Sequence, residues 1–399
     1  MLNFNFCRPT DFYFGRGQEN HTGEICKKHG AKKVLLHYGG QSAVKSGLIT
    51  RIQESLDEAD VKYVLLGGVQ PNPRAELVYE GIRLCREHNV DLVLAVGGGS
   101  VIDSAKAIAM GVPYAGDFWD FFMGGKKPER ALPVGCVLTI AAAGSEGSNS
   151  CVIDKEVDGV VRKKGSRFQS NVCTFSILNP ELTFTLPPFQ TACGACDIMC
   201  HVFERYFTNT RGVLMTDELC EGVLRTIVQM LPRVMKDPKD YEARANIMWA
   251  STLAHNDLLG VDREQDWGSH HIEHELSALY DCAHGAGLAV VTPAWMSYVY
   301  KHDVMRFARF AVNVMGCQMD YEDPQKTALA GIAALRRLWG EAGLPLNFKE
   351  LGAKKEDIPT IVDNLGGPEH TEGKFMVLSK KEVAEILTLA ADYERPAQP

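Results

Sequence analysis

Long apolar runs, an excess of positive charge and a regular cysteine framework are all missing from this sequence. No segment approaches the roughly eighteen consecutive apolar residues of a membrane-spanning helix. The first residues, MLNFNFCRPTDF, lack the basic and then apolar order of a secretory signal peptide. The formal net charge of −8 argues against nucleic acid or an anionic membrane as a main partner. We therefore expect a cytoplasmic protein.

The twelve cysteines are scattered along 399 residues without regular spacing. In a long chain this usage is typical of free thiols in a reducing compartment. Cys193 and Cys196 form a CxxC motif, and Cys200 follows one helical turn later. Such a motif can carry a redox or zinc role, but no second CxxC accompanies it. We therefore favour helix packing for these three thiols.

Two common nucleotide motifs are also absent, since the chain has neither a GxGxxG fingerprint nor a GxxxxGK[ST] loop. Two other glycine turns follow predicted strands. The strand expected at 91–96 runs directly into Gly97 to Ser100 and a helix, and the strand at 32–38 ends on Gly39 to Ser42. Glycines let the backbone approach a pyrophosphate, and a helix N-terminus offers it free N–H groups. A simple turn between strand and helix is the alternative interpretation.

The pattern of elements changes near the middle of the chain. A further strand, 132–138, ends in the small-residue segment 139–147, which suits the wall of a site for a flat ring. Strand signals fade after the segment that ends at Pro188. We therefore predict an α/β dinucleotide-binding domain with a parallel sheet at 1–188 and an all-α metal-binding domain at 189–399, with the site in the cleft between them. The last six residues, ERPAQP, are expected to be disordered.

Histidine is concentrated in one stretch, because four of the twelve histidines lie within the fifteen residues 270–284. His270 and His274 are four apart and would share a helix face. His284 follows His270 by fourteen residues, or about 21 Å along an unbroken helix. A metal shared by His270 and His284 therefore requires the helix to end near Tyr280 or Asp281. The alternative is a helix whose histidines are solvated or packed in the core.

Asp197 and His201 form a second pair, also four apart, in an apolar stretch that predicts a helix. Together with two histidines of the 270–284 stretch, they would supply one carboxylate and three imidazoles. Such a set suits Zn²⁺ or Fe²⁺ and is too rich in nitrogen for Mg²⁺ or Ca²⁺. Structural zinc sites usually use thiolates, so we favour a catalytic metal that can add a substrate oxygen.

Taken together, these features show that the sequence resembles the iron-containing (group III) alcohol dehydrogenase family over nearly its whole length. The resemblance is strongest to the NADPH-linked butanol dehydrogenase and aldehyde reductase branch. It rests on Phe14-Gly15-Arg16-Gly17, Gln70-Pro71-Asn72-Pro73, Gly97-Gly98-Gly99-Ser100-Val101-Ile102-Asp103, Gly144-Ser145-Glu146, Thr185-Leu186-Pro187, Asp197-x3-His201, His270-x3-His274 and His284-Gly285. The chain has Ala143 where the family often has Thr, and GGQS at 39–42 where close relatives have GGGS.

The resemblance implies a dehydroquinate synthase-like architecture and a homodimer or larger homo-oligomer. It implies that Asp197, His201, His270 and His284 bind one divalent metal, Fe²⁺ or Zn²⁺, and that His274 lies near the nicotinamide. It also implies a dinucleotide laid across the two glycine turns. The cofactor-binding residues are then Gly39, Gly40, Ser42, Gly97, Gly98, Gly99, Ser100, Asp103, Thr139 and Ser145.

The turn at 39–42 bears on the choice of cofactor. An acidic residue here would bind the ribose 2′-hydroxyl of NAD(H) and repel a 2′-phosphate. The turn has no acid, and Lys45 can add positive charge. We therefore predict NADP(H) rather than NAD(H) as the cofactor. His37, near the end of the preceding strand, would contribute if protonated, although packing is its favoured role.

These inferences predict a metal-dependent, NAD(P)H-linked alcohol dehydrogenase or aldehyde reductase that interconverts primary, butanol-like alcohols and aldehydes. The metal would polarise the carbonyl for hydride transfer. His274 is the candidate proton relay, with an ordered water and the cofactor ribose as the competing route. Trp267, close to His270, would line an apolar space for a small alkyl chain or pack in the core.

Three alternatives stay open at this point. The stretch from His270 to His274 also fits the H-x-x-E-H pattern of inverted zinc peptidases, with Glu273 as general base. That interpretation leaves Asp197, His284 and the glycine turns unused. A metal-dependent enzyme such as dehydroquinate synthase would keep the fold and use NAD only transiently. A non-catalytic nucleotide-binding module is hard to reconcile with a complete set of metal ligands.

Overall fold

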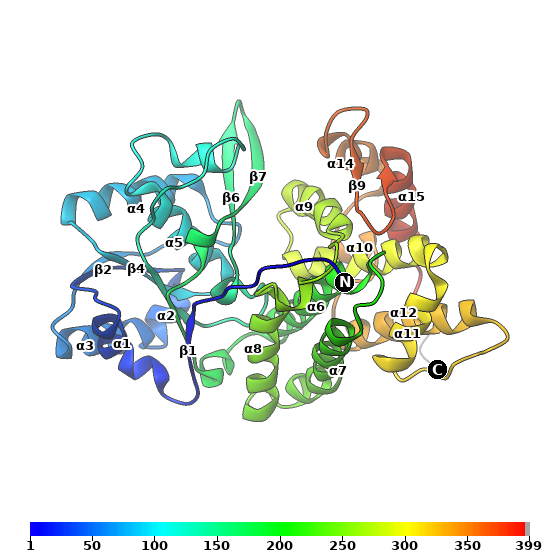
Figure 1. Cartoon of the computed structure of the whole chain (residues 1–399), viewed down its shortest axis with the longest axis horizontal. Helices are drawn as coiled ribbons and strands as arrows, with labels where there is room; N and C mark the ends of the chain where they lie inside the picture. Colours follow the sequence, from blue (N-terminus) through cyan, green and yellow to red (C-terminus); the bar gives the residue numbers. More distant parts are fainter. Residues whose placement is uncertain (396–399) are drawn as a thin grey trace. The chain divides into compact units, whose positions relative to one another are not determined.

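The computed structural model describes residues 1–395, so the part of the ERPAQP tail beyond Arg395 lies outside the described residues. Contacts divide the chain into two compact units, which Figure 1 shows in outline. One unit is Cys7–Thr185, and the other combines Met1–Phe6 with the chain from Leu186 onward. Among the described residues, no helix is long and apolar enough to cross a membrane. The domain ranges 1–188 and 189–399 stay a prediction.

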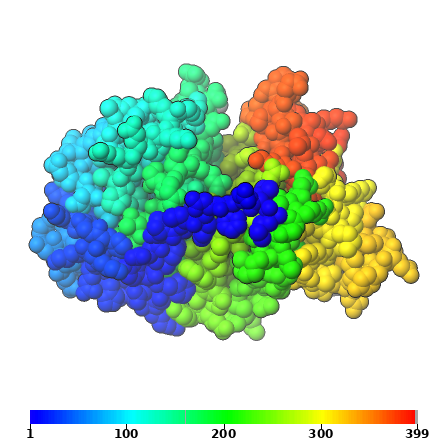
Figure 2. Space-filling view, viewed as in Figure 1, coloured from blue at the N-terminus to red at the C-terminus, as the bar shows by residue number. Residues whose placement is uncertain are grey.

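The segment Met1–Phe6 belongs to the helical unit because its backbone is bonded there. The amino group of Met1 donates to the carbonyl of Arg211 at 2.8 Å, and the N–H of Leu2 donates to the carbonyl of Asp262 at 2.7 Å. Figure 2 shows this segment, in dark blue, lying open on the viewed face. No sequence signal predicts these long-range bonds, since they use only backbone groups.

A six-stranded parallel sheet forms the centre of the unit Cys7–Thr185, with strand order β1-β8-β5-β4-β2-β3. The strands rich in branched apolar residues, β2, β4 and β5, lie in its interior, as expected for strands covered on both faces. This confirms the predicted α/β fold with a parallel sheet. The strands are β1 Asp11–Phe14, β2 Lys33–Tyr38, β3 Lys62–Leu66, β4 Leu92–Gly97, β5 Val134–Leu138 and β8 Phe175–Leu178.

Helices and an antiparallel hairpin complete this unit. The hairpin turns at Asp158 and Gly159, which both have positive φ, as a two-residue Asp-Gly turn requires. Its strands are β6 Ser150–Val157 and β7 Val160–Arg167. The helices are α1 Thr22–Lys28, α2 Gln41–Lys45, α3 Leu48–Glu58, α4 Ala75–His88 and α5 Gly99–Gly111, with 3-10 turns η1 Gln18–His21, η2 Phe118–Phe121, η3 Ser145–Gly147, η4 Gln169–Asn171 and η5 Pro180–Thr183.

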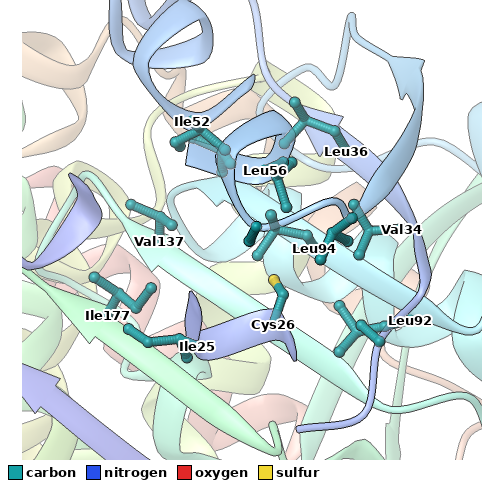
Figure 3. Packing of buried hydrophobic residues seen from close by; sticks show 14 of the residues in the cluster. Ile25, Cys26, Val34, Leu36, Ile52, Leu56, Leu92, Leu94, Val137 and Ile177 are labelled. Atoms are coloured by element: carbon teal, nitrogen blue, oxygen red, sulfur yellow. The ribbon is translucent and has the colours of Figure 1, made fainter. Parts of the chain in front are cut away.

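A hydrophobic core cluster of the unit lies between the sheet and helices α1 and α3 (Figure 3). Leu36 of β2 and Leu94 of β4 are partners in register, and both side chains are fully buried. Ile52 and Leu56 of α3 pack in the same cluster. Because the register pairs β2, β4 and β5 without a slip, the turns that follow these three strands come together at one edge of the sheet.

The second unit is helical, apart from a two-residue antiparallel ladder. Its central helix is α6, in which every residue from Thr191 to Tyr206 is buried, as expected for a helix covered on all sides. The helices are α6 Pro188–Tyr206, α7 Leu214–Lys236, α8 Tyr241–His255, α9 Gly268–Tyr280, α10 His284–Val299, α11 Val304–Asn313, α12 Pro324–Glu341, α13 Phe348–Leu351, α14 Ile358–Asn364 and α15 Lys380–Ala391, with 3-10 turns η6 Leu258–Gly260, η7 Tyr300–His302 and η8 Lys355–Asp357. The ladder pairs β9 Thr371–Glu372 with β10 Leu378–Ser379.

Helices α6 and α10 approach closely because Gly285 has no side chain. A Cβ at Gly285 would lie 2.1 Å from the carbonyl oxygen of Cys193, which is backbone and cannot move aside. The first turn of α10 is thereby fixed against the middle of α6. The aspartate and histidines considered below lie at this contact.

His37 joins three elements of the first unit. Its Nδ1 lies 2.9 Å from the carbonyl of Leu66 on β3, and its Nε2 lies 2.8 Å from Oγ of Ser104 on α5. Burial lowers the pKa of His37 to about 4, against a smaller opposing effect of the bond to Leu66. The ring is therefore neutral at pH 7, which agrees with a packing role and removes it as a source of positive charge for a 2′-phosphate.

We expect His37 to make the protein sensitive to acid. Its folded pKa lies below the unfolded value of 6.5, so only the unfolded chain binds the proton as pH falls from about 6.5 to about 4. His37 therefore leaves the free energy of unfolding unchanged above pH 6.5 and lowers it by about 3 kcal/mol as the pH falls from about 6.5 to about 4. Urea unfolding of the wild type and His37→Gln at several pH values measures it. Equal pH slopes for the two chains would contradict the assignment.

Candidate functional site

Helix α6 places Asp197 and His201 on one buried face. Nδ1 of His201 lies 2.9 Å from both the carbonyl oxygen and Oδ1 of Asp197, and its hydrogen bond goes to the carbonyl. As a result, Oδ1 of Asp197 is buried without a hydrogen-bond partner among residues 1–395. Both side chains are nearly inaccessible to water, at 6% and 7% exposure.

Two further histidines reach the same carboxylate oxygen from α9 and α10. Helix α9 ends at Tyr280, and Asp281 follows in the left-handed region with φ 47°. This confirms the predicted break and lets α10 begin at His284. Nε2 of His270 is then 3.9 Å from Oδ1 of Asp197, and Nε2 of His284 is 3.8 Å from it. The structure thus brings Asp197, His201, His270 and His284 together.

The donor set fits a divalent metal. Within the described chain, Oδ1 of Asp197 and Nε2 of His270 are both buried without a hydrogen-bond partner, which is costly unless something else satisfies them. Asp197, His201 and His270 offer ligand atoms that all lie within 4.8 Å of one another. Metal bonds of about 2 Å place neighbouring ligand atoms on the order of 3–4 Å apart, in line with the distances above. One carboxylate and three imidazoles suit Fe²⁺ or Zn²⁺.

Buried carboxylates accept hydrogen bonds from Nδ1 of two of the histidines. Glu204 of α6 accepts hydrogen bonds from Nδ1 of His270 at 2.6 Å, from Oγ of Ser269 at 2.7 Å and from the N–H of Trp267 at 2.6 Å. Glu273 of α9 accepts a hydrogen bond from Nδ1 of His284. Our sequence analysis missed Glu204, although a charged residue in the buried stretch after His201 was a usable signal.

The electrostatics of this cluster favour positive charge. Burial by itself would keep the His270 ring neutral, but its contacts with Asp197 and Glu204 raise the pKa of His270 to about 10. Burial likewise opposes ionisation of Glu204, yet the bond from His270 holds the pKa of that carboxyl below its usual range. The site is therefore built for a cation.

The arrangement argues against the peptidase interpretation. Glu273 is fully buried and bonded to His284, so it does not stand free as a general base beside a metal on His270 and His274. His274 is half-buried, with its ring centroid 5.3 Å from that of His284. It groups with Glu273 and His284 rather than with Asp197.

Aromatic rings form one wall of the cluster. Trp267 has φ 68° and stands edge-on to the rings of His201 and His270, at centroid distances of 5.9 and 5.3 Å. His255, the last residue of α8, meets His201 edge-on at 4.2 Å. Sequence analysis did not single out His255, because its place depends on how α8 packs. Trp267 is thus a packing partner of the predicted ligands.

The predicted cofactor residues gather at the carboxyl ends of three neighbouring strands. Gly39, Gly40 and Ser42 follow β2, Gly97 to Ser100 follow or end β4, and Thr139 follows β5. The N–H of Thr139 donates to the carbonyl of Gly97 at 3.0 Å, which ties two of these turns together. A Cβ at Gly97 would lie 2.4 Å from Cγ2 of Val101, so a glycine is needed there for α5 to begin so tightly.

Asp103 and Ser145 are bonded to each other. Oγ of Ser145 donates to Oδ1 of Asp103 at 2.5 Å, and the N–H of Val152 donates to Oδ2 of Asp103 at 2.9 Å. Lys106, which is fully buried, donates to the carbonyls of Ser145, Ser148 and Ser150 and to Oγ of Ser145. These residues hold the loop after β5 against α5. Their direct contact with a cofactor stays a prediction.

The three cysteines of α6 are packing residues, as expected. Sγ of Cys196 lies 4.0 Å from Sγ of Cys200, and Sγ of Cys200 lies 3.4 Å from Oγ1 of Thr292. Burial raises the pKa of the Cys193 thiol to about 12 and that of Cys196 well above its usual value. Protonated, buried thiols of this kind are poor nucleophiles.

Comparisons with known proteins cover almost the whole chain. The family model described as iron-containing alcohol dehydrogenase matches residues 9–180. The model described as the C-terminal part of the Fe-containing alcohol dehydrogenase family matches residues 191–391. The two matches leave only short stretches unassigned.

Individual relatives agree with the family models. NADH-dependent butanol dehydrogenase A of Clostridium acetobutylicum is 40% identical over 391 residues, covering 97% of this chain and 99% of the relative. The NADPH-dependent aldehyde reductase YqhD of Escherichia coli is 36% identical over 368 residues, covering 92% and 93%. The crystal structure of NADH-dependent butanol dehydrogenase A of Thermotoga maritima matches with a TM-score of 0.93 at 42% identity, covering 98% and 99%. The chain therefore belongs to the iron-containing alcohol dehydrogenase family, whose enzymes interconvert alcohols and aldehydes with NAD(P)H and a divalent metal.

Proposed function

We propose that this protein acts in the cytoplasm as a metal-dependent reductase of small aldehydes and, in reverse, as a dehydrogenase of primary alcohols of about the size of butanol. The observation that carries the proposal is the convergence of Asp197, His270 and His284, with two buried atoms of this group left without hydrogen-bond partners in residues 1–395. The names of the relatives, butanol dehydrogenase and aldehyde reductase, support this substrate class.

We propose Asp197, His201, His270 and His284 as the ligands of Fe²⁺ or Zn²⁺. When bound, the metal supplies Lewis acidity toward a carbonyl or alcohol oxygen, and the nicotinamide gives or takes the hydride. The protein fixes the tautomer of each ring, because Nδ1 of His201 donates to a carbonyl and Nδ1 of His270 and of His284 donates to a carboxylate. In the neutral form of each ring, Nε2 then carries the lone pair that can bind a metal.

We propose NADP(H) as the preferred cofactor. The turn from Gly39 to Ser42 carries no carboxylate to repel a 2′-phosphate, and Lys45 at the end of α2 is exposed. The relatives are divided on this point, since YqhD is named as NADPH-dependent and the butanol dehydrogenases as NADH-dependent. The proposal therefore rests on the charge of the turn. The other predicted residues, Gly97, Gly98, Gly99, Ser100, Asp103, Thr139 and Ser145, are proposed to line the dinucleotide site.

An absorbance assay tests the metal and the reaction together. We expect the metal-stripped chain to leave NADPH unoxidised with butanal, and added Fe²⁺ or Zn²⁺ to restore oxidation. Asp197→Asn should lose metal binding, since the neutral amide is a poor replacement for the carboxylate at the point where the histidines meet. No oxidation with either cofactor and either metal would contradict the proposed function.

The same assay measures cofactor choice. We expect kcat/KM to be at least about tenfold higher for NADPH than for NADH, and Lys45→Ala to narrow the ratio by removing a cation. A ratio that favours NADH in the wild type would overturn the preference while leaving the reaction class intact.

We propose His274 as the proton relay. It lies one turn after His270 on α9, and its half-buried ring is 5.3 Å from that of His284. An ordered water with the cofactor ribose is the competing route.

Replacing His274 with Phe should lower kcat by about 100-fold or more while sparing metal content, because general acid–base catalysis typically contributes that much. The neighbouring His271→Phe is the matched control, since His271 is exposed and bonded to Glu372. Metal content and pH profiles of kcat check the two variants. An unchanged pH profile with full turnover in His274→Phe would remove the relay from the mechanism.

We also propose a homodimer or larger homo-oligomer. The segment Met1–Phe6 has no helix or strand, and Leu2 and Phe4 are 48% and 56% exposed. Leu214 and Met215 of the same unit are exposed to a similar degree. Apolar side chains of this kind are typical of surfaces that a second copy covers.

Light scattering after size exclusion should give a mass of twice 44.0 kDa or more for the wild type. The double variant Leu2→Ser, Phe4→Ser should shift toward the monomer, because it removes apolar area that a partner would bury. Met305→Ser, an exposed apolar residue of α11, is the control and should not shift. A monomeric wild type would refute the oligomer, and a double variant that stays oligomeric would refute this surface.

A further inference from the structure

Glu273 is a buried carboxylate with few partners. It lies on α9 with no exposed surface, and Oε2 accepts a hydrogen bond from Nδ1 of His284. The other oxygen, Oε1, has no hydrogen-bond partner in the part of the chain that the structure describes. A carboxylate buried in this way is unfavourable unless a positive charge nearby compensates it.

The neighbouring helix leaves room for this side chain at Gly287. A Cβ at Gly287 would lie 2.4 Å from Oε1 and 2.8 Å from Cγ of Glu273. Gly287 lies within α10, where a glycine is less favourable for the helix than an alanine. The small residue on α10 and the carboxylate on α9 are therefore matched to each other.

Glu273 is connected to Asp197 through the ring of His284. The ring of His284 lies between Glu273 and Asp197, with Nδ1 bonded to Glu273 and Nε2 3.8 Å from Oδ1 of Asp197. Glu204 differs, because it also accepts bonds from Ser269 and from the backbone of Trp267, which hold the start of α9. Glu204 therefore stabilises the start of α9 as well as His270, whereas the hydrogen bond of Glu273 goes to His284.

We propose that Glu273 is a positioning residue for the metal, a role that rests on the proposed function. Its hydrogen bond holds the His284 ring with Nε2 toward Asp197, and its negative charge makes the ring a stronger donor. In this role Glu273 acts through His284, because its Oε2 accepts the hydrogen bond from Nδ1 while Nε2 of the same ring is directed toward Asp197. A cation held by Nε2 of His284 would supply the compensating charge that the burial of Glu273 requires.

Metal affinity tests this role without relying on activity. The full-length, metal-stripped chain is titrated with Zn²⁺ or Co²⁺ in competition with a chromophoric chelator, and the visible spectrum of bound Co²⁺ is recorded. We expect Glu273→Ala to weaken binding by about 10- to 100-fold, the usual effect of removing such a partner. Glu273→Gln should fall between the wild type and Glu273→Ala, because its amide oxygen still accepts the bond but carries no charge.

Glu221→Gln is the matched control. Glu221 is as fully buried as Glu273, but it forms an ion pair with Arg309 and accepts hydrogen bonds from Tyr206 and Asn313 instead of from a histidine. It should keep the affinity of the wild type. A loss of metal affinity could come from a changed metal site or from a destabilised fold. Thermal unfolding of the metal-free chains separates these two causes, since Glu273→Gln should melt within a few degrees of the wild type. If Glu273→Ala does not fold, Glu273→Gln alone decides the question.

A double-mutant cycle tests the match with Gly287. Gly287→Ala should displace the Glu273 carboxylate and weaken metal binding, but it should add little in a chain that already carries Glu273→Ala. Additive losses would show that the two positions act independently and would overturn the match.

The outcomes separate this inference from the proposed function. A wild-type chain that binds neither Zn²⁺ nor Co²⁺ removes the metal site and this role with it. A wild type that binds metal, with Glu273→Ala and Glu273→Gln binding it equally well and with the same Co²⁺ spectrum, overturns the role of Glu273 and leaves the metal site intact.

Discussion

The charge of Asp197, which is buried on α6 of the helical unit, is the constraint on which the surrounding structure depends. Burial opposes its ionisation, yet the nearby rings of His201 and His270 hold the pKa of Asp197 well below its usual range. A buried carboxylate of this kind needs positive charge near Oδ1, the oxygen that has no hydrogen-bond partner in residues 1–395. The elements around it are arranged to bring imidazole nitrogens to Oδ1, and this requirement explains features that local sequence preferences oppose.

The route of the chain from α9 to α10 is one such feature. Asp281 takes a left-handed conformation, and Gly285 and Gly287 lie inside a helix, where glycine is unfavourable. Gly285 lets α10 approach the backbone of Cys193, and Gly287 leaves space for Glu273. A residue with a side chain at either position would push α10 away from its neighbours, and His284 would move with it.

The sequence was most informative where a function depends on local spacing. Helix geometry alone places Asp197 and His201 on one face, because they are four residues apart. The density of histidine at 270–284 can likewise be read directly from the sequence. The parallel sheet was also predicted from local patterns, namely short apolar runs that end in glycine turns before a helix. The predicted end of the helix near Tyr280 or Asp281 is found at Asp281, whereas Gly285 and Gly287 allow close packing of α10 against α6 and α9.

Roles set by distant partners were beyond this kind of prediction. Glu204 and Glu273 bond histidines that are 66 and 11 residues away in the chain, so local spacing does not predict these pairings. The H-x-x-E-H pattern drew attention to Glu273, but as a general base and not as a partner of His284. His37 is neutral because it is enclosed between β3 and α5, which composition does not reveal. Met1–Phe6 belongs to the helical unit, and the bonds that Met1 and Leu2 make there use backbone groups. In each case the deciding interaction is tertiary and leaves no periodic trace in the sequence.

Both units use a buried charged side chain to set the shape of a site before a ligand binds. In the helical unit, Glu204 orients His270 and the backbone at Trp267. In the other unit, Lys106 gathers the carbonyls of the loop around Ser145, and Asp103 fixes the hydroxyl of Ser145. A buried charge with several good bonds has one favourable geometry, because any departure leaves it unsatisfied in a medium of low dielectric constant. Rigidity obtained in this way lowers the ordering cost of binding a metal or a dinucleotide. The buried polar groups of this chain are therefore better understood as the means of preorganisation than as contributions to overall stability.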